Sequence, residues 1–257
     1  MCGQPTDKAG PWHTINGRNY MRKEKVTLPE TLAANGYATG HFGKWHLGDN
    51  YPYRPHDRGF QHAFYHGGGG VGQTPDYFGN DYNDDTYFLN GEPIKFEGYC
   101  TDIWFGEALK WIEKNKEKPF FAYISTNSPH SPFIVDPKYS DLYANAKMPG
   151  AAVEAEAADD AKTKKGKAKK KGKPKGVNAA FYGMITNIDE NFGLLMEKLD
   201  EWDAWDNTLV IFMTDNGQAG KNAKKDGEKV TLHTAGFKSG KGSVYEGGSH
   251  VPAFWRW

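Results

Sequence analysis

The sequence predicts an α/β fold, with a mostly parallel sheet that helices cover on both faces. Segments with the apolar spacing of helices alternate along the chain with short runs of consecutive apolar residues. Such continuous runs are typical of parallel strands buried on both faces. The 257 residues, of which 38% are hydrophobic and 14% aromatic, suffice for one large or two small domains of this class.

The first predicted helix covers residues 28–35. Thr27 and Glu30 have the spacing of a capping box, in which two side chains satisfy backbone amides at the start of a helix. Pro29 suits the first turn, and Gly36 is typical of the residue just beyond a helix. The sequence therefore predicts both ends of this helix.

The next elements alternate between strand and helix. A strand is predicted over Tyr37–Phe42 and a second helix over residues 102–115. The evidence for this helix is the i, i+3, i+4, i+7 spacing of its apolar residues, Phe105, Ala108, Leu109 and Ile112. The apolar run Phe120–Ile124 then predicts a buried strand.

The last third of the chain continues this alternation. A third helix follows residue 176, and its apolar side chains are expected along one face: Phe181, Ile185, Ile188, Phe192, Leu195 and Leu199. Leu209–Met213 is rich in β-branched and aromatic residues and predicts a strand. Val251–Trp255 predicts one further strand.

A tract of different composition interrupts the predicted domain at residues 150–176. It has one Val as its only large apolar side chain, so it cannot offset the entropy of ordering, and we expect a disordered, solvated insertion. A polyanion-binding patch is the functional alternative. The charges balance at 32 of each sign, but without the nine lysines and four acids of residues 151–176 the remainder is mildly acidic. Nucleic acid is therefore not expected as a partner.

Cysteine content and hydropathy further restrict the classes of protein to which this chain can belong. Cys2 and Cys100 are the only cysteines, which excludes a disulfide framework and a cysteine-rich zinc module. No apolar stretch approaches the roughly 20 residues that a membrane-spanning helix needs. The first residues also lack the apolar core of a signal peptide.

Polar residues follow the predicted strands at their carboxyl ends, where ligands of open α/β sheets bind. These residues are Lys44 and His46 in GKWHLG, His130 in NSPHSP, Asp215 and Asn216 in TDNG, and Lys241 in a Gly-rich turn. The two lysines offer charge for a sulfate or phosphate, and the histidines can move protons. The Asp-Asn pair offers hard oxygen ligands for Ca²⁺ or Mg²⁺. Together they predict metal-assisted cleavage of an anionic ester.

Plainer interpretations stay open for each of these segments. Asp-Asn-Gly is commonly only a turn, and a Lys or His beside a Trp commonly packs at the edge of a core. The five histidines between 41 and 66 suggest zinc, namely His41, His46, His56, His62 and His66, but no ligand spacing frames them and a His-rich loop is favoured. Gly67–Gly70 lacks the Lys and Ser/Thr of a nucleotide-binding P-loop.

Four motifs together resemble the sulfatase family of the alkaline-phosphatase-like superfamily. They are GYATGHFGKWHLGD at 36–49, NSPH at 127–130, LVIFMTDNG at 209–217 and GKGSVYEGGSHVPAFWRW at 240–257. The resemblance covers nearly the whole chain apart from the Lys-rich tract, so it implies that residues 1–257 are part of a sulfatase catalytic domain. It further implies an exported parent protein, periplasmic or secreted, that cleaves a small-molecule or carbohydrate sulfate ester.

The resemblance also implies roles for individual residues. In sulfatases the Lys and His of the GKWH motif contact the nucleophile and the sulfate, which implies Lys44 and His46 here. It implies that His130 and Lys241 contact the sulfate and the leaving oxygen, with His130 as general acid. By the same comparison Asp215 and Asn216 are ligands of one calcium ion.

Two features of the family pattern are missing. A sulfatase nucleophile is a formylglycine made from the Cys of a C-x-P-S-R motif, and neither Cys2-Gly-Gln-Pro-Thr nor the segment around Cys100 matches it. The acidic pair that completes the calcium site is also missing. We therefore expect a fragment of a sulfatase with weak calcium affinity and no turnover of its own. The alternatives are a non-catalytic binder of sulfated glycans and a phosphatase or phosphodiesterase of the same superfamily.

Overall fold

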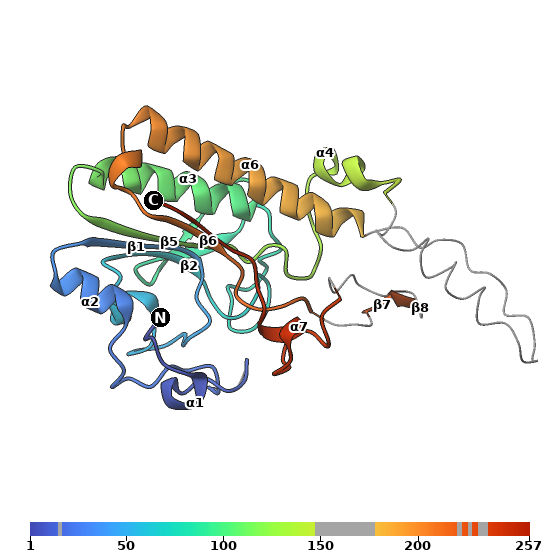
Figure 1. Cartoon of the computed structure of the whole chain (residues 1–257), viewed down its shortest axis with the longest axis horizontal. Helices are drawn as coiled ribbons and strands as arrows, with labels where there is room; N and C mark the ends of the chain where they lie inside the picture. Colours follow the sequence, from blue (N-terminus) through green and yellow to red (C-terminus); the bar gives the residue numbers. More distant parts are fainter. Residues whose placement is uncertain (15–16, 147–177, 220–222, 226–227, 231–235) are drawn as a thin grey trace, which may run out of the picture. The chain divides into compact units, whose positions relative to one another are not determined.

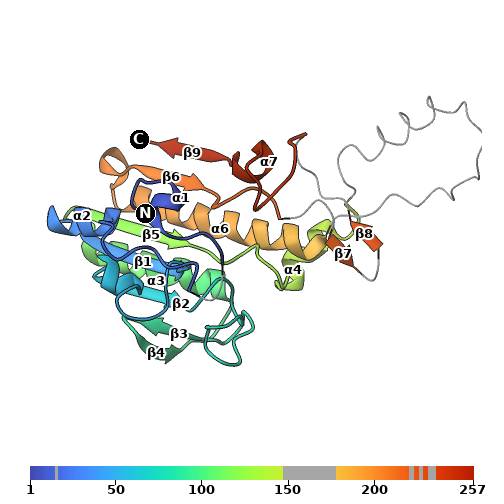
Figure 2. The ribbon, with the colours of Figure 1, turned by 90° about the horizontal axis from the view of Figure 1, so that it is seen from below.

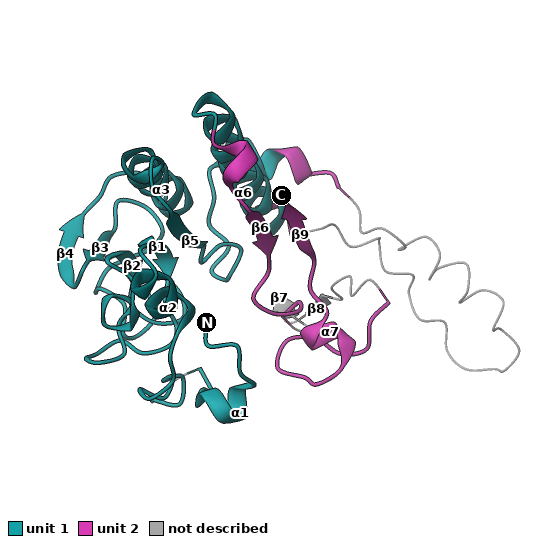
Figure 3. Cartoon of the chain, turned by 60° about the vertical axis from the view of Figure 1, so that its left-hand side comes forward, with its two compact units in different colours: residues 1–141, 180–203 teal, residues 142–179, 204–257 magenta. Residues whose placement is uncertain are grey.

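The computed structural model describes residues 1–14, 17–146, 178–219, 223–225, 228–230 and 236–257. The chain divides into two compact units (Figure 3). Residues 1–141 and 180–203 form unit 1, and residues 142–179 and 204–257 form unit 2. The predicted disordered insertion at 150–176 lies outside the described residues.

Unit 1 is built on a five-stranded sheet in the order β4-β3-β2-β1-β5 (Figure 2). The central strand β1, Ala38–Lys44, pairs in parallel with β2, His62–His66, and with β5, Phe120–Ser125. An antiparallel pair, β3 at Thr86–Leu89 and β4 at Glu92–Lys95, extends the sheet beyond β2. The predicted parallel sheet is confirmed for its centre, and the β3–β4 edge makes the sheet mixed.

Helices lie on both faces of this sheet (Figure 1). Helix α2, Leu28–Ala34, begins with the predicted capping box: the Thr27 side chain accepts from the Glu30 amide and the Glu30 carboxylate accepts from the Thr27 amide. Helix α3, Cys100–Asn115, covers the other face. Both predicted helices are thus confirmed, and α3 starts two residues before its expected position.

Alternating side chains of the strands divide the core of unit 1 into two clusters. On the α3 face, Phe42 and Phe64 pack against Trp104 and Met184, all of them buried. On the opposite face, the second cluster consists of Trp45, Phe60, Ala63 and Tyr65. This separation follows from the pleat of the sheet, which sends successive side chains to opposite faces.

Helix α6, Ala179–Glu201, is the predicted third helix. It is tied to α3 by the carboxylate of Asp102, whose Oδ1 accepts hydrogen bonds of 2.7 Å from the amides of Asn187 and Asn191. The expected apolar face is only partly right, because Ile185 is 40% exposed. The buried residues of α6 are Gly183, Met184, Asn187, Leu195 and Leu199.

The remaining elements of unit 1 and its boundary are short. Helices α1 and α4 cover Thr6–Ala9 and Pro137–Ser140, and the 3-10 turns η1 and η2 cover Pro55–Arg58 and Asp141–Tyr143. Among the described residues, no helix is long and apolar enough to cross a membrane.

Unit 2 contains two small antiparallel sheets. Strand β6, Val210–Met213, pairs with β9, Ala253–Arg256, which confirms both predicted strands as elements. We expected β6 in the same parallel sheet as β1 and β5, and this is wrong for the described pairings, because β6 and β9 form a separate antiparallel sheet. The other elements are β7 at Ala223–Lys225, β8 at Glu228–Val230, η3 at Trp205–Asn207 and α7 at Glu246–Ser249.

Candidate active site

The parallel strands of unit 1 end together, and the predicted polar residues follow them directly. Lys44 is the last residue of β1 and is in register with His66, the last residue of β2. His46 lies two residues beyond β1, and His130 lies five residues beyond Ser125, the end of β5. The carboxyl end of this sheet is therefore the candidate site.

The backbone of Lys44 is fixed by the side chains of buried His41 and half-buried Ser125. The hydroxyl of Ser125 donates to the Lys44 carbonyl oxygen at 2.7 Å, and Nε2 of His41 lies 3.1 Å from the same oxygen. Burial lowers the pKa of His41 to about 3, so the ring is neutral. Because both groups converge on one carbonyl, they hold the end of β1 from which the Lys44 side chain emerges.

His46 is packed against a glycine-rich turn. Its Nε2 lies 2.7 Å from the carbonyl oxygen of Thr14, so that nitrogen carries the proton and donates. A Cβ atom at Gly69 would lie 2.4 Å from Cε1 of the imidazole. Gly69 therefore lets the turn approach His46 more closely than any other residue type allows, and this gives Gly67–Gly70 a packing role.

The backbone around His130 is held by one buried tyrosine. The hydroxyl of Tyr82, which is fully buried, donates to the carbonyl oxygen of His130 at 2.9 Å. The amide of His130 donates to the Asn127 carbonyl at 2.9 Å, and its Nδ1 donates to the Ser131 carbonyl at 2.7 Å. Because Nδ1 carries a proton, Nε2 is the atom of this imidazole that is left to exchange a proton with a ligand.

A second tyrosine fixes the same loop on either side of His130. Tyr99 stacks on Tyr82, with ring centroids 6.3 Å apart. Its hydroxyl donates to the Ile134 carbonyl at 2.9 Å and lies 3.3 Å from the Ser128 hydroxyl, which in turn lies 3.0 Å from the Thr101 hydroxyl. The loop that carries His130 is therefore attached to the first turn of α3.

His66 connects the three predicted residues of unit 1. It is completely buried, and its pKa is lowered to about 3, first by burial and then by the charges of Lys44, His46 and His130. These three side chains therefore lie within electrostatic reach of one imidazole. We did not predict a role for His66 in sulfate binding; its place at the end of a short apolar segment, Ala63–Tyr65, is a sequence signal that could have identified it.

The expected His-rich loop between residues 41 and 66 is wrong for three of its histidines. His41 lies on β1, and His62 and His66 lie at the two ends of β2. We did not predict strand β2 from its sequence, His-Ala-Phe-Tyr-His, because only three apolar residues lie between two polar ones. The described residues contain no group of three or more His, Cys, Asp or Glu side chains that could hold a metal ion.

In unit 2 the Asp-Asn turn and the Gly-rich turn lie against each other. The amide of Gly217, directly after Asn216, donates to the Gly248 carbonyl at 2.9 Å, and the Lys241 amide donates to the Gln218 carbonyl at 2.7 Å. A Cβ at Gly217 would lie 2.0 Å from the carbonyl oxygen of Gly247, so this approach requires glycine. The structure thus brings the Asp215–Asn216 turn close to the turn that carries Lys241.

These residues do not form a complete calcium site by themselves. Ca²⁺ takes six to eight oxygen ligands, whereas Asp215 and Asn216 supply side-chain oxygens from only two residues. Asp215 is exposed, and within the described ranges it belongs to no cluster of three metal-ligating side chains. The donor set is therefore a part of a calcium site at most.

The thiol of Cys100 is not suited to act as a nucleophile. Cys100 is fully buried at the start of α3, and burial raises the pKa of its thiol to about 12. Because the thiolate is the nucleophile, a thiol with this pKa is inert near neutral pH. Cys2 is partly buried near the start of the chain.

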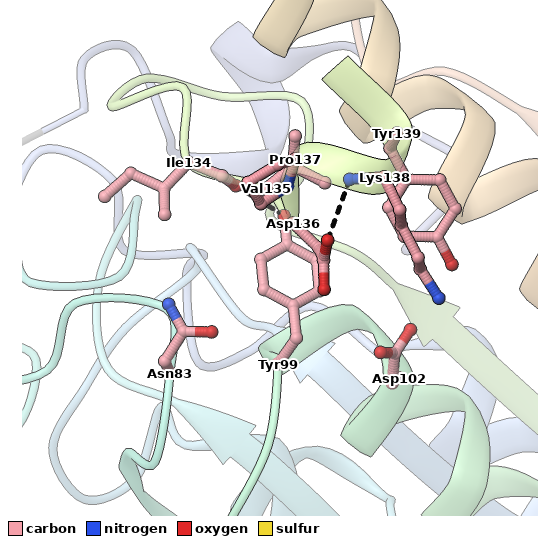
Figure 4. A pocket seen from close by; sticks show the side chains of 9 residues that line it. All are labelled: Asn83, Tyr99, Asp102, Ile134, Val135, Asp136, Pro137, Lys138 and Tyr139. Atoms are coloured by element: carbon pink, nitrogen blue, oxygen red, sulfur yellow. Dashed lines mark hydrogen bonds between the residues drawn. The ribbon is translucent and has the colours of Figure 1, made fainter. Parts of the chain in front are cut away.

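A cavity of about 440 Å³ lies next to the loop that carries His130. Figure 4 shows the Asp102 carboxylate and the Lys138 ammonium on one side of it and Asn83 on the other. Tyr99, which holds the His130 loop, also lines this cavity. The other lining residues are Ile134, Val135, Asp136, Pro137 and Tyr139.

Comparisons with known proteins identify the family of the chain. A family model described as Sulfatase matches residues 1–257. The uncharacterized sulfatase YdeN of Escherichia coli (strain K12) is 25% identical, over 100% of this chain and 43% of that protein. An arylsulfatase of Klebsiella aerogenes is 31% identical, over 84% of this chain and 54% of that protein.

The fold of this chain is similar to that of a solved structure. The crystal structure of Ps i-CgsB in complex with k-i-k-neocarrahexaose has 27% sequence identity and a TM-score of 0.75, over 100% of this chain and 53% of that one. The predicted α/β fold of the alkaline-phosphatase-like type is thereby confirmed. The chain spans about half the length of the curated relatives it matches.

Proposed function

The chain belongs to the sulfatase family, and we propose that it binds the sulfate group of a sulfate monoester and contributes to the hydrolysis of that ester. The observation that carries this proposal is that Lys44 ends β1 in register with His66, while His46 and His130 follow β1 and β5 at the same carboxyl end of the sheet. One ammonium and two imidazoles in one place suit the anionic sulfate group of such an ester.

The residues of unit 1 have distinct proposed roles. Lys44 provides a fixed positive charge for the sulfate oxygens, since its backbone is held by Ser125 and His41. His46 presents its imidazole to the nucleophile and the sulfate. When a nucleophilic oxygen forms a bond to the sulfur and the ester sulfur–oxygen bond breaks, His130 gives a proton to the leaving alcohol oxygen. The network of Tyr82 and Tyr99 keeps the loop of His130 in place.

The proposed contributions of unit 2 are one charge and two metal ligands. Lys241 adds a second ammonium for the sulfate, and Asp215 with Asn216 contributes oxygen ligands to a calcium ion. A calcium ion supplies positive charge that polarises a bound oxyanion. The turns that carry these residues are held together by the hydrogen bonds of Gly217 and Lys241.

We propose that residues 1–257 bind sulfate without turning over an ester on their own. The family nucleophile is a formylglycine made from a Cys-x-Pro-Ser-Arg motif, and neither cysteine of these residues lies in such a motif. The buried thiol of Cys100, with its pKa of about 12, does not replace it. This same observation favours a second candidate function, which is non-catalytic binding of sulfated glycans.

The cavity beside the His130 loop is the proposed place for part of the alcohol that carries the sulfate. Its volume of about 440 Å³ lies within the range of small-molecule sites, and its rim has carboxylate, amide and ammonium groups suited to hydroxyls. Replacement of Asn83 by Leu is then expected to weaken binding of a sulfated oligosaccharide but not of a small aryl sulfate. Equal effects on both ligands would contradict this assignment.

The experiment that tests the function measures sulfate binding and ester hydrolysis separately. Calorimetric titration of inorganic sulfate into the protein is compared with Lys44→Ala and His130→Ala, and with Lys110→Ala as a control on the exposed side of α3. We expect that Lys44→Ala weakens sulfate binding at least tenfold and that the control does not. Unchanged binding in Lys44→Ala would refute the proposed sulfate site.

A hydrolysis assay distinguishes the enzyme from the binder. A chromogenic aryl sulfate is incubated with residues 1–257 in the presence of Ca²⁺, after expression in a host that makes formylglycine. We expect binding but no release of the aryl alcohol. Turnover that His130→Ala abolishes would show that the nucleophile is among these residues, contrary to our proposal.

A further inference from the structure

His66 occupies a place in the sheet that determines which side chain it can meet. It is in register with Lys44 on the neighbouring parallel strand, so both side chains project from the same face. Its ring is completely buried and lies 6.0 Å from the ring of Trp104 on that face. The side chain directly opposite His66 on the neighbouring strand is therefore that of Lys44.

The hydrogen bonding of His66 defines which ring nitrogen carries the proton. Nδ1 lies 3.0 Å from the carbonyl oxygen of Gly67, and because a carbonyl oxygen only accepts, Nδ1–H is the donor. In the neutral ring Nε2 is then an acceptor. This buried Nε2 has no hydrogen-bond partner among the described residues.

An unsatisfied buried acceptor destabilises the folded state unless a donor reaches it in some functional state. The groups whose charges act on this ring are Lys44, His46 and His130. His130 and His46 already donate one ring proton to a backbone carbonyl. The Lys44 ammonium has three donors, and Lys44 is in register with His66 on the neighbouring strand, so it is the best candidate donor.

We propose that His66 is a positioning residue for Lys44: its Nε2 accepts a hydrogen bond from the Lys44 ammonium when an oxyanion is bound. One proton of the ammonium then points to His66, and the other two point to the anion. The inference rests on the proposed function, because it assigns an orientation to the lysine that is proposed to hold the sulfate.

The neutrality of His66 explains why a histidine suits this position. A carboxylate at the same place would also orient the ammonium, but it would cancel the positive charge that the sulfate requires. A protonated imidazole would repel the ammonium. A buried neutral imidazole of fixed tautomer accepts the hydrogen bond and leaves the charge of Lys44 available to the ligand.

The first test compares sulfate affinity in three variants by calorimetric titration. His66→Phe removes the acceptor and keeps a ring, and His66→Gln keeps an acceptor oxygen near the position of Nε2. His62→Phe is the matched control, because His62 is a histidine at the other end of the same strand. We expect His66→Phe to weaken sulfate binding about tenfold, His66→Gln to restore most of the loss, and the control to bind as the unmodified protein does.

The second test needs no variant of His66 and therefore does not depend on how that variant folds. The ¹⁵N resonances of the His66 ring are recorded in the unmodified protein with and without inorganic sulfate, and again in Lys44→Ala. We expect the Nδ1–H tautomer throughout, and a sulfate-induced change at Nε2 that marks hydrogen-bond acceptance. This change should be absent in Lys44→Ala.

The two tests distinguish the role of His66 from the proposed sulfate site. If Lys44→Ala loses sulfate binding while His66→Phe keeps it and the Nε2 resonance ignores sulfate, the role of His66 is refuted and the proposed function stands. If sulfate binds equally well to Lys44→Ala, the proposed sulfate site itself is refuted. An Nε2–H tautomer in the unmodified protein would also overturn the role of His66.

Discussion

Two buried neutral histidines make the stability of the folded chain dependent on pH. His41 and His66 are both completely buried, and burial lowers the pKa of each to about 3 from its ordinary value of 6.5. In the unfolded chain both rings take up protons below about pH 6.5, whereas in the folded chain they stay neutral down to about pH 3. The unfolded state therefore binds more protons in this window, and stability is lost as the pH falls.

The size of the effect follows from these two pKa values. Between pH 7.5 and pH 5.5 each histidine reduces the free energy of unfolding by about 1.4 kcal/mol, so the pair reduces it by about 2.7 kcal/mol. The pKa values of His56 and His62 are also lowered by burial, and they act in the same direction. A loss of this size is a large fraction of the stability of an ordinary domain.

Urea unfolding, followed by tryptophan fluorescence at both pH values, measures this loss. We expect a clearly lower urea midpoint at pH 5.5, and about half of the pair's contribution should disappear in His66→Phe. His13→Gln changes an exposed histidine and is the control, which should show the same drop as the unmodified protein. Equal midpoints at the two pH values, or an unaltered drop in His66→Phe, would refute the reasoning.

Three further predictions concern single contacts in unit 1. Tyr82→Phe removes the hydroxyl that holds the carbonyl of His130. We expect the free energy of unfolding, measured with urea, to fall by about 1–2 kcal/mol and sulfate binding to weaken. Unchanged values of both would show that this hydrogen bond does not hold the loop. Gly69→Ala places a methyl group 2.4 Å from the imidazole of His46. Calorimetry should therefore detect a loss of sulfate-binding free energy that is larger than the accompanying loss of folding stability. Undiminished sulfate affinity would contradict the role of His46. Thr27→Ala removes the capping box of α2 and should cost about 1 kcal/mol of stability without an effect on sulfate binding, which the same two measurements check.

Local signals in the sequence were sufficient for most of the helices and strands. The capping box at Thr27 and Glu30 acts within one turn, so the start of α2 could be predicted to the residue. The apolar runs Phe120–Ile124 and Leu209–Met213 predicted β5 and β6 as strands, but the expected full burial is wrong for both, because their residues are half-buried or exposed. The motifs around Lys44, His130, Asp215 and Lys241 indicated the chemistry of the site and the family.

The errors arose where contacts distant in sequence decide the structure. Strand β6 pairs with β9, and an apolar run does not specify whether its partner is parallel or antiparallel. The face of α6 turns Ile185 toward solvent and Asn187 inward, because the carboxylate of Asp102 on α3 accepts from that amide. Apolar spacing alone cannot anticipate a buried polar residue whose partner lies 85 positions away.

The sequence by itself determined the fold class, the first and last residues of several elements to within a few positions, and the residue types that suit an anionic ester. Only the tertiary structure decided that His66 lies beside Lys44, that Tyr82 and Tyr99 hold the His130 loop, and that Cys100 is buried. The physical reason is that hydrophobic periodicity and capping depend on neighbours within one or two turns. Register, burial and the proton of a ring nitrogen depend on side chains that meet only when the sheet has formed.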